Sequence, residues 1–301
     1  MEYLRTPDDR FTGLKDYDFA PRYLDIADGE GGQLRMHYID EGPRDAAPVL
    51  CLHGEPTWSY LYRHMIPVFT AAGHRVIAPD LIGFGKSDKP VRREDYTYQR
   101  HVDWTGEALR KLDLNGITLV CQDWGGLIGL RLVAEMPERF ARVVTANTAL
   151  PTGDQPMGAA FDSWRAFSQQ VDPFPAGRIV YGGTISKLDA EEVAAYDAPF
   201  PDERHKAGAR QFPVLVPSRP DDPAAPANRS AWQVLERFAK PWLTAFGADD
   251  KIMAGVDRQF QTRIPGAQGQ PHRLLPDAGH FLQEDVGPEL AVLVNDWIAA
   301  N

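Results

Sequence analysis

The sequence predicts an α/β fold with a mostly parallel central sheet flanked by helices and with one helical insertion. Short apolar segments typical of buried strands alternate with segments of helical periodicity in the first half of the chain, and the alternation resumes near its end. Between these parts, residues 151–214 contain aromatic-rich helical segments and no convincing buried strand. We therefore expect a core domain formed by residues 1–150 and 215–301 and a helical cap formed by residues 151–214.

The first predicted elements form an antiparallel pair. Residues 34–38 alternate apolar and polar side chains, which is typical of a strand with one buried face. Gly29, Gly31 and Gly32 separate this strand from an apolar run at residues 23–26, so a hairpin is expected there.

The later elements follow one another as strands and helices. The predicted strands are residues 49–52, 75–78, 117–121, 143–146, 242–246 and 272–275, and the predicted helices are residues 60–72, 97–112, 125–135 and 290–298. In the last of these helices Leu290, Leu293, Val294 and Trp297 share one face.

The composition is that of an ordinary globular protein and excludes several classes of partner. Of 301 residues, 43% are hydrophobic and 25% are charged, and the net charge of −10 would repel a nucleic acid. The charged amino terminus lacks a signal-like apolar run, and no stretch is long enough to cross a bilayer, so we expect a cytoplasmic protein. The only two cysteines, Cys51 and Cys121, follow or end apolar runs and are expected in the core, not in a disulfide or a metal site.

The most informative motif lies at residues 119–126, where an apolar strand meets a helix through Gln-Asp-Trp-Gly-Gly. Small residues around a strand-to-helix turn are typical of the nucleophile elbow of α/β-hydrolases, and here the central residue is Asp123. A carboxylate needs no base to become nucleophilic, and the helix amino terminus favours its anionic form. Taken alone, the motif serves equally well as a helix N-cap, so both interpretations stay open at this point.

Further motifs favour the catalytic interpretation of Asp123. Glu55 follows the strand at residues 49–52, where this fold forms half of its oxyanion hole, so the backbone N–H groups of Glu55 and Trp124 are expected to converge on one oxygen. Asp250 lies three residues after the Gly that ends a predicted strand, and this spacing selects it over Asp249 as the triad acid.

His280 lies between the last predicted strand and the final helix, which completes the order nucleophile, acid, histidine. His272 falls within a predicted strand and is expected to be structural. The ordered set of motifs favours an active enzyme.

With these residues identified, the chain resembles the haloalkane dehalogenases over nearly its whole length. The resemblance rests on HGEPTWSYLYRHMIP at 53–67, APDLIGFGKSDKP at 78–90, QDWGG at 122–126, FDSW at 161–164 and YDAPFPD at 196–202. It implies that Asp123 is the nucleophile, His280 the base and Asp250 its partner, and that Trp124 and Trp164 bind the halide. From the residues alone, Trp164 would be interpreted as a packing residue on a helix.

The implied reaction needs no cofactor and no metal. Asp123 displaces halide from an sp³ carbon and forms an alkyl ester, which water activated by His280 then hydrolyses to an alcohol. The expected partners are a small halogenated alkane, a halide ion and water, and nothing demands more than a monomer. The pocket wall is expected to be apolar and to include Leu127, Phe161, Phe212, Pro213 and Val216.

Other functions of the same fold are alternatives to this one. An epoxide hydrolase shares the Asp nucleophile and uses two cap tyrosines as acid, and Tyr181 and Tyr196 lie in the expected cap. A fluoroacetate-type dehalogenase would carry an Arg where Trp124 stands, and a serine esterase is incompatible with Asp123 at the elbow. A non-catalytic receptor on the same fold is the alternative from a different class, and a complete triad disfavours it.

Overall fold

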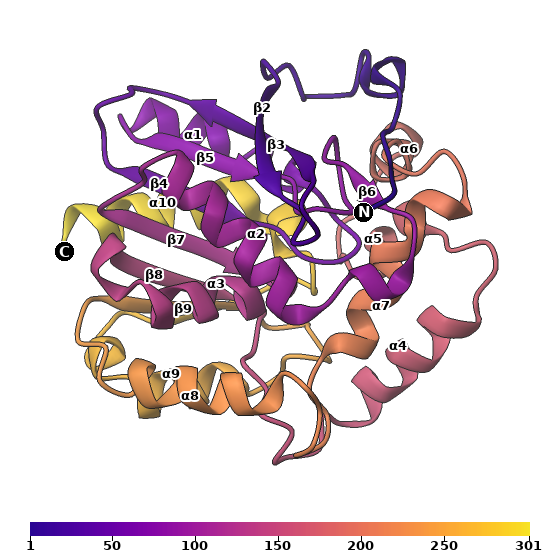
Figure 1. Cartoon of the computed structure of the whole chain (residues 1–301). Coiled ribbons are helices and arrows are strands. Elements are labelled where there is room, and N and C mark those ends of the chain that lie inside the picture. Colours follow the sequence, from indigo (N-terminus) through magenta and orange to yellow (C-terminus); the bar gives the residue numbers. More distant parts are fainter.

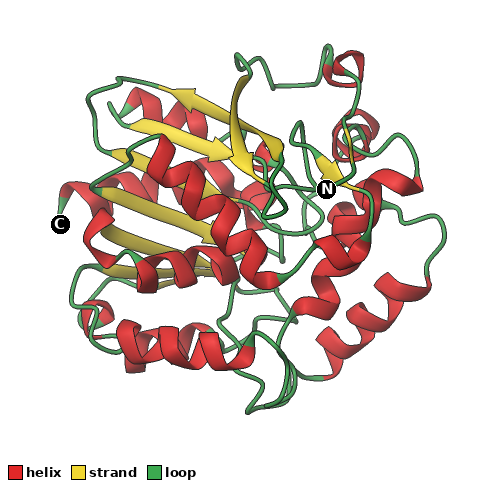
Figure 2. Cartoon of the chain, in the orientation of Figure 1, coloured by secondary structure: helices red, strands yellow, loops and turns green.

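The computed structural model describes all 301 residues and contains one large twisted sheet with helices on both faces (Figure 1, Figure 2). The sheet has eight strands in the order β10-β9-β8-β7-β4-β5-β3-β2. Its strands are β2 (Arg22–Ala27), β3 (Gln33–Glu41), β4 (Pro48–Leu52), β5 (Arg75–Pro79), β7 (Ile117–Gln122), β8 (Phe140–Ala146), β9 (Trp242–Gly247) and β10 (Arg273–Leu275). Only the β2–β3 and β3–β5 pairs are antiparallel, so the predicted hairpin and the predicted parallel sheet are confirmed. A separate antiparallel pair joins β1 (Tyr3–Leu4) to β6 (Lys89–Pro90).

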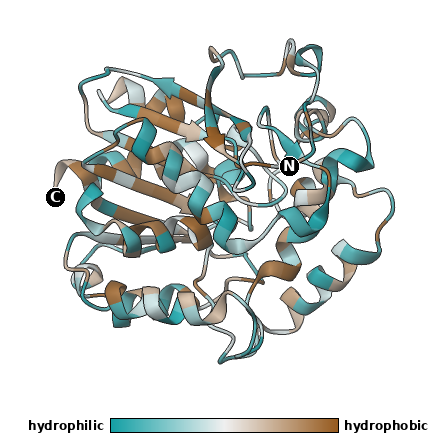
Figure 3. Ribbon diagram, viewed as in Figure 1, coloured by the Kyte–Doolittle hydropathy of each residue, from teal (hydrophilic) through white to brown (hydrophobic).

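Residues of the central strands point alternately to two apolar layers. In β4, Leu50 and Leu52 belong to the layer covered by α2, α3, α8 and α9, whereas Val49 and Cys51 belong to the layer covered by α1 and α10. The covering helices are α1 (Ile66–Ala71), α2 (Tyr98–Lys111), α3 (Trp124–Glu135), α8 (Ala225–Leu235), α9 (Asp257–Arg263) and α10 (Leu282–Ala299). Burial on both faces explains why these strands are continuous apolar runs in the sequence, and Figure 3 shows them as hydrophobic.

Four further helices lie beyond the carboxyl ends of the parallel strands (Figure 1). They are α4 (Ala159–Gln170), α5 (Ala176–Gly182), α6 (Ala190–Asp197) and α7 (Ala207–Leu215). They occupy the segment that the sequence predicted to be helical, and α7 ends one residue beyond the expected boundary at 214.

Some predicted boundaries differ from the structure. The helix expected at residues 60–72 is a 3-10 turn at Ser59–Tyr62 followed by α1, and Pro67 lies in the first turn of that helix. The final helix begins at Leu282, well before residue 290, and bends at Val286, close to Pro288. The helices α8 and α9 were not predicted. No helix combines the length and the hydropathy that crossing a bilayer requires.

Candidate active site

Asp123 forms a sharp turn between β7 and α3 with φ +49° and ψ −127°, a conformation that a non-glycine residue rarely adopts. The turn is possible because its neighbours are small. A Cβ on Gly125 would lie 2.0 Å from the carbonyl oxygen of Leu52, and a Cβ on Gly126 would lie 1.9 Å from Oγ1 of Thr148. The same hydroxyl group donates to the carbonyl oxygen of Asp123 at 2.7 Å. The sequence therefore forms an elbow that presents the Asp123 side chain at the edge of the sheet.

The loop after β4 contacts the Asp123 carboxylate directly. The backbone N–H of Glu55 donates to Oδ1 of Asp123 at 2.7 Å. A Cβ on Gly54 would lie 2.1 Å from the same oxygen, so this close approach requires glycine. The backbone N–H of Trp124, the second expected donor, makes no hydrogen bond in the structure. Its participation in an oxyanion hole stays a prediction.

His280 lies between two carboxylates. Its Nδ1 is 2.7 Å from Oδ2 of Asp250, and its Nε2 is 3.5 Å from Oδ2 of Asp123. The backbone N–H groups of Ile252 and Met253 donate to Oδ1 of Asp250 at 2.8 and 3.2 Å, which fixes the acid. The imidazole is therefore oriented from one side and faces the nucleophile with its other nitrogen.

Opposite charges in this cluster shift the pKa values of His280 and Asp250. Burial alone would lower the pKa of His280, but the negative charge of Asp250 and the hydrogen bonds to Asp123 and Asp250 raise it to about 10. Burial alone would raise the pKa of Asp250, but the charge of His280 and the hydrogen bonds from the imidazole and two backbone N–H groups lower it. In the free protein the surroundings of His280 thus favour its protonated form.

The side chain of Glu55 is a second buried carboxyl group of the site. Glu55 is 5% exposed, and its Oε1 has no hydrogen-bond partner. Burial and the negative charge of Asp123 raise its pKa well above the usual range, although His280 opposes this effect. Burial in this position therefore favours the uncharged form of the group.

Asn147 connects the loops that carry the three triad residues, a role that the sequence reasoning missed. Its carbonyl oxygen accepts from the backbone N–H of Asp123 at 3.0 Å. Its Nδ2 donates to the carbonyl oxygens of Gly279 and His280 at 2.7 and 3.0 Å, and its Oδ1 accepts from the N–H of Gly247 at 2.8 Å. Its only signal in the sequence is its place directly after the strand at residues 143–146.

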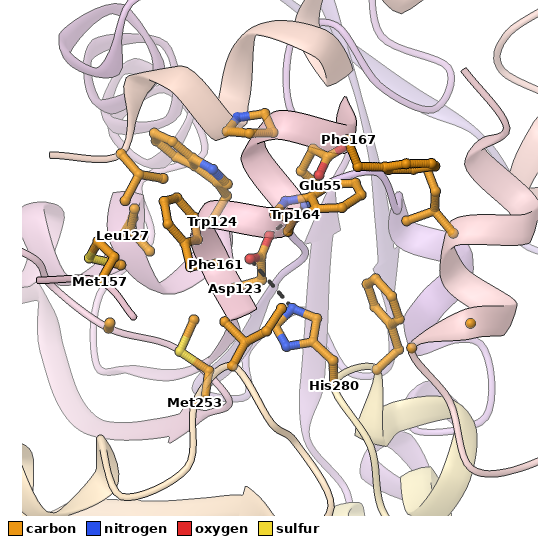
Figure 4. Close-up of a pocket in the computed structure, with 18 of the residues that line it drawn as sticks. Glu55, Asp123, Trp124, Leu127, Met157, Phe161, Trp164, Phe167, Met253 and His280 are labelled. Carbon is orange, nitrogen blue, oxygen red and sulfur yellow. Dashed lines mark hydrogen bonds and ion pairs between the residues drawn. The ribbon is translucent and has the colours of Figure 1, made fainter. Parts of the chain in front are cut away.

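A cavity of about 380 Å³ opens over Asp123 and His280 (Figure 4). The side chains of Trp124, at the start of α3, and Trp164, on α4, both line it, and neither indole N–H donates a hydrogen bond within the protein. Figure 4 shows both indole rings bordering the space beside the Asp123 carboxylate. Two free indole donors at one carboxylate suit a large, diffuse anion.

Most of the predicted wall residues line this cavity. Leu127, Phe161, Pro213 and Val216 are among its lining residues. Phe212 is not, which corrects the expectation. Its fully buried ring stacks on Trp124 with centroids 4.4 Å apart and so lies behind that indole. Lining residues that the sequence did not reveal are Ala149, Pro151, Met157, Phe167, Pro175, Arg178, Ile179, Gly182, Gly183, Ile252, Met253 and Phe281.

The two tyrosines that an epoxide hydrolase would need are not at the cavity. Tyr181 is 43% exposed, and neither it nor Tyr196 lines the cavity. Tyr196 is fully buried and donates to Glu284. The remaining histidine considered above, His272, accepts from the N–H of Thr244 and so has a structural contact.

Comparisons with known proteins agree with this geometry. Residues 47–181 match the model of a family described as alpha/beta hydrolase fold. A haloalkane dehalogenase of Psychrobacter cryohalolentis is 59% identical over 301 residues, which cover 100% of this chain and 99% of that protein. The chain belongs to the haloalkane dehalogenase family.

Two further similarities extend over the same length. A haloalkane dehalogenase of Mycolicibacterium paratuberculosis is 55% identical over 297 residues, which cover 99% of this chain and 98% of that protein. The solved structure of the tetrameric haloalkane dehalogenase from Paraglaciecola agarilytica superposes with a TM-score of 0.91 at 39% identity and 97% coverage of both chains. The activity of the family, hydrolysis of carbon–halide bonds in haloalkanes, is therefore the activity of this enzyme, and the epoxide hydrolase alternative is not favoured.

Proposed function

We propose that this haloalkane dehalogenase works through an alkyl ester on Asp123. The observation that carries the proposal is the placement of one carboxylate between a backbone donor, a histidine and two free indole N–H groups in an apolar cavity. A carboxylate oxygen attacks the sp³ carbon, the carbon–halogen bond breaks with its electron pair, and the halide leaves toward Trp124 and Trp164. Indole N–H groups stabilise the departing charge without binding the halide as tightly as a cation would.

In the second step, His280 acts as the base. Water loses a proton to Nε2 and attacks the ester carbonyl carbon of Asp123, while the backbone N–H groups of Glu55 and Trp124 stabilise the oxyanion. Collapse of this intermediate breaks the bond between the carbonyl carbon and the alkoxy oxygen, and the alkoxide takes the proton from His280 and leaves as the alcohol. The carboxyl group of Asp123 then loses its proton to solvent, which restores the carboxylate. Asp250 holds the imidazole in orientation and stabilises its positive charge.

Alkylation prepares His280 for this role. The ester has no negative charge, so one of the contributions that raise the pKa of His280 to about 10 is lost when it forms. The imidazolium that accompanies the free carboxylate can then release its proton to solvent and become a base. The nucleophile thus controls the protonation state of the base by its own conversion to an ester.

The helices α4 to α7 serve as a cap in this proposal. Phe161 and Trp164 reach the cavity from α4, and Pro213 reaches it from α7, whereas Asp123 and His280 belong to loops of the sheet. Residues 151–215 would therefore cover the active site at the carboxyl ends of the parallel strands, and residues 1–150 and 216–301 would form the core domain.

A halide-release assay tests the mechanism. Wild-type protein and the Asp123→Ala variant are incubated with 1-bromobutane or 1,2-dibromoethane, and bromide is measured. Intact mass spectrometry of the His280→Phe variant should detect one alkyl group per chain, because the ester forms but is not hydrolysed. Bromide release by Asp123→Ala at the wild-type rate, or His280→Phe without an adduct, would contradict the proposal.

The monomeric state and the cytoplasmic location stay predictions. Each chain contains a complete triad and cavity, so catalysis needs no second subunit. The relative from Paraglaciecola agarilytica is described as tetrameric. Light scattering after size-exclusion chromatography would measure the mass of this protein in solution.

A further inference from the structure

The backbone around His280 is hydrogen-bonded to a loop of the helical cap. Residues 183–186, here called the cap loop, follow α5, and residues 279–281, here called the histidine loop, precede α10. The carbonyl oxygen of Gly183 accepts from the N–H of His280 at 2.7 Å and from the N–H of Phe281 at 3.3 Å. None of the chemical steps above uses these contacts.

One carboxylate binds both loops. Oδ1 of Asp285 accepts from the N–H groups of Ile185 at 2.9 Å and Ser186 at 2.7 Å in the cap loop. Its Oδ2 accepts from the N–H of Gly279, directly before His280, at 2.8 Å. Hydrogen bonds to an ionised acceptor are shorter and stronger than neutral ones, so Asp285 is well suited to hold the loops together.

The two loops touch without space for intervening side chains. A Cβ on Gly279 would lie 2.5 Å from the carbonyl oxygen of Gly183, and a Cβ on Gly183 would lie 2.6 Å from the ring of Phe281. A shift of the cap loop must therefore be accompanied by a shift of the histidine loop. Interiors packed this closely transmit displacement instead of absorbing it.

The core holds the same residue from its other side. The carbonyl oxygen of His280 accepts from Asn147 at 3.0 Å and from Nε2 of Gln122 at 3.1 Å. The backbone N–H of His280 is thus held by the cap loop, which Asp285 binds. Its backbone carbonyl oxygen is held by residues at the ends of sheet strands. Contacts on both sides thus hold the backbone from which Nε2 is directed at Asp123.

We propose that Asp285 is a positioning residue for His280, which it holds through the histidine loop and the cap loop. The inference rests on the proposed role of His280 as the base. Formation of the ester needs Asp123 and the halide donors but not His280, whereas hydrolysis of the ester needs a correctly placed Nε2. Loss of the Asp285 carboxylate should therefore slow the second step and spare the first.

Single-turnover kinetics with 1,2-dibromoethane separate the two steps. Rapid quenching followed by bromide measurement reports ester formation, and mass spectrometry of the alkylated chain reports its hydrolysis. For Asp285→Ala we expect bromide release at the wild-type rate and hydrolysis slower by roughly 10- to 100-fold, since a displacement of about 1 Å can cost about 100-fold. Asp285→Asn keeps an acceptor oxygen and should recover part of the hydrolysis rate.

Asp189→Ala is the matched control. Asp189 also belongs to the cap and accepts from two backbone N–H groups, those of Glu191 and Glu192, but it does not contact the histidine loop. Its removal should lower the thermal unfolding temperature without accumulation of the ester.

Three results would overturn the inference while leaving the mechanism intact. They are wild-type hydrolysis in Asp285→Ala, an equal loss of both steps in that variant, and an accumulated ester in Asp189→Ala. If Asp285→Ala does not fold, the ratio of the two rates in Asp285→Asn decides the matter. Failure of the mechanism itself is distinguishable, because His280→Phe would then carry no alkyl group.

Discussion

Replacing Asp123 by Asn imitates the electrostatic change that alkylation produces, because both replace a carboxylate by an uncharged carbonyl group of similar shape. In the wild-type protein the pKa of His280 is raised to about 10, against the effect of burial, by the charge of Asp250 and by its contacts with Asp123 and Asp250. Nε2 of His280 and Oδ2 of Asp123 are 3.5 Å apart. At an effective dielectric constant of about 20, that separation corresponds to about 4–5 kcal/mol, or at least a thousandfold in the proton affinity of His280. The pKa of His280 should therefore fall from about 10 into the neutral range in Asp123→Asn.

Titration of the His280 imidazole by NMR in both proteins measures this change. Intact mass spectrometry should accompany it to verify that the amide of Asp123→Asn persists. Asp249→Asn is the control, because it removes the same charge from an exposed neighbour of Asp250 and should leave the imidazole titration unchanged. An equally high pKa of His280 in wild type and Asp123→Asn would refute the idea that alkylation converts the histidine into a base.

The same shift predicts a difference in stability against pH. Because the folded protein holds the proton of His280 more tightly than the unfolded chain does, the resulting stabilisation is fully present below the pKa of an unfolded histidine, about 6.5. It is lost as the pH rises through about 10. Between pH 7 and 10, the free energy of unfolding of wild type should therefore fall more steeply than that of Asp123→Asn in urea titrations.

The remaining predictions concern the cavity and the elbow. Trp164→Phe removes one halide donor and should slow bromide release by roughly 10- to 100-fold, as expected for a hydrogen bond to a charge worth about 1.5–3 kcal/mol, with little change in thermal unfolding; an unchanged rate would exclude it as a halide ligand. Gly54→Ala places a Cβ 2.1 Å from Oδ1 of Asp123 and should abolish turnover, whereas Gly287→Ala, with 3.4 Å to its nearest neighbour, should be tolerated in the same assay. Glu55→Gln should raise the unfolding temperature more at pH 8 than at pH 5, because a carboxyl group whose pKa is raised on folding destabilises the protein above its unfolded pKa.

The sheet was predictable because its strands are buried on both faces. The segments at β4, β7 and β9 are fully buried and therefore appear in the sequence as predominantly apolar runs. The helix α8 was missed because prolines at residues 213–226 resemble a loop. Pro226 lies in the first turn of that helix, where its missing N–H costs nothing.

The site was predictable to the extent that its residues follow strands. Asp123 comes directly after β7 and Asp250 three residues after β9, and parallel strands bring such residues to one edge of the sheet. The cavity wall was harder, because the sequence places Phe212 on an apolar helix without revealing which neighbour its ring meets. Met157 and Met253 reach the cavity from loops that only the folded chain brings together.

The structure adds that the relative placement of the triad depends on one uncharged side chain. The amide of Asn147 supplies the two donors that the carbonyl oxygens of Gly279 and His280 require and the one acceptor that the N–H of Gly247 requires. An aspartate there would keep the acceptor but direct an oxygen at two carbonyl groups. A leucine would leave the carbonyl oxygen of Gly279 and the N–H of Gly247 unpaired, and the carbonyl oxygen of His280 would keep only the hydrogen bond from Gln122. Since the backbone carbonyl oxygen of Asn147 also accepts from the N–H of Asp123, the loops of the proposed nucleophile, acid and base all meet at this one residue. In the proposed mechanism, main-chain contacts thus set the geometry of the reacting groups as much as the catalytic side chains do.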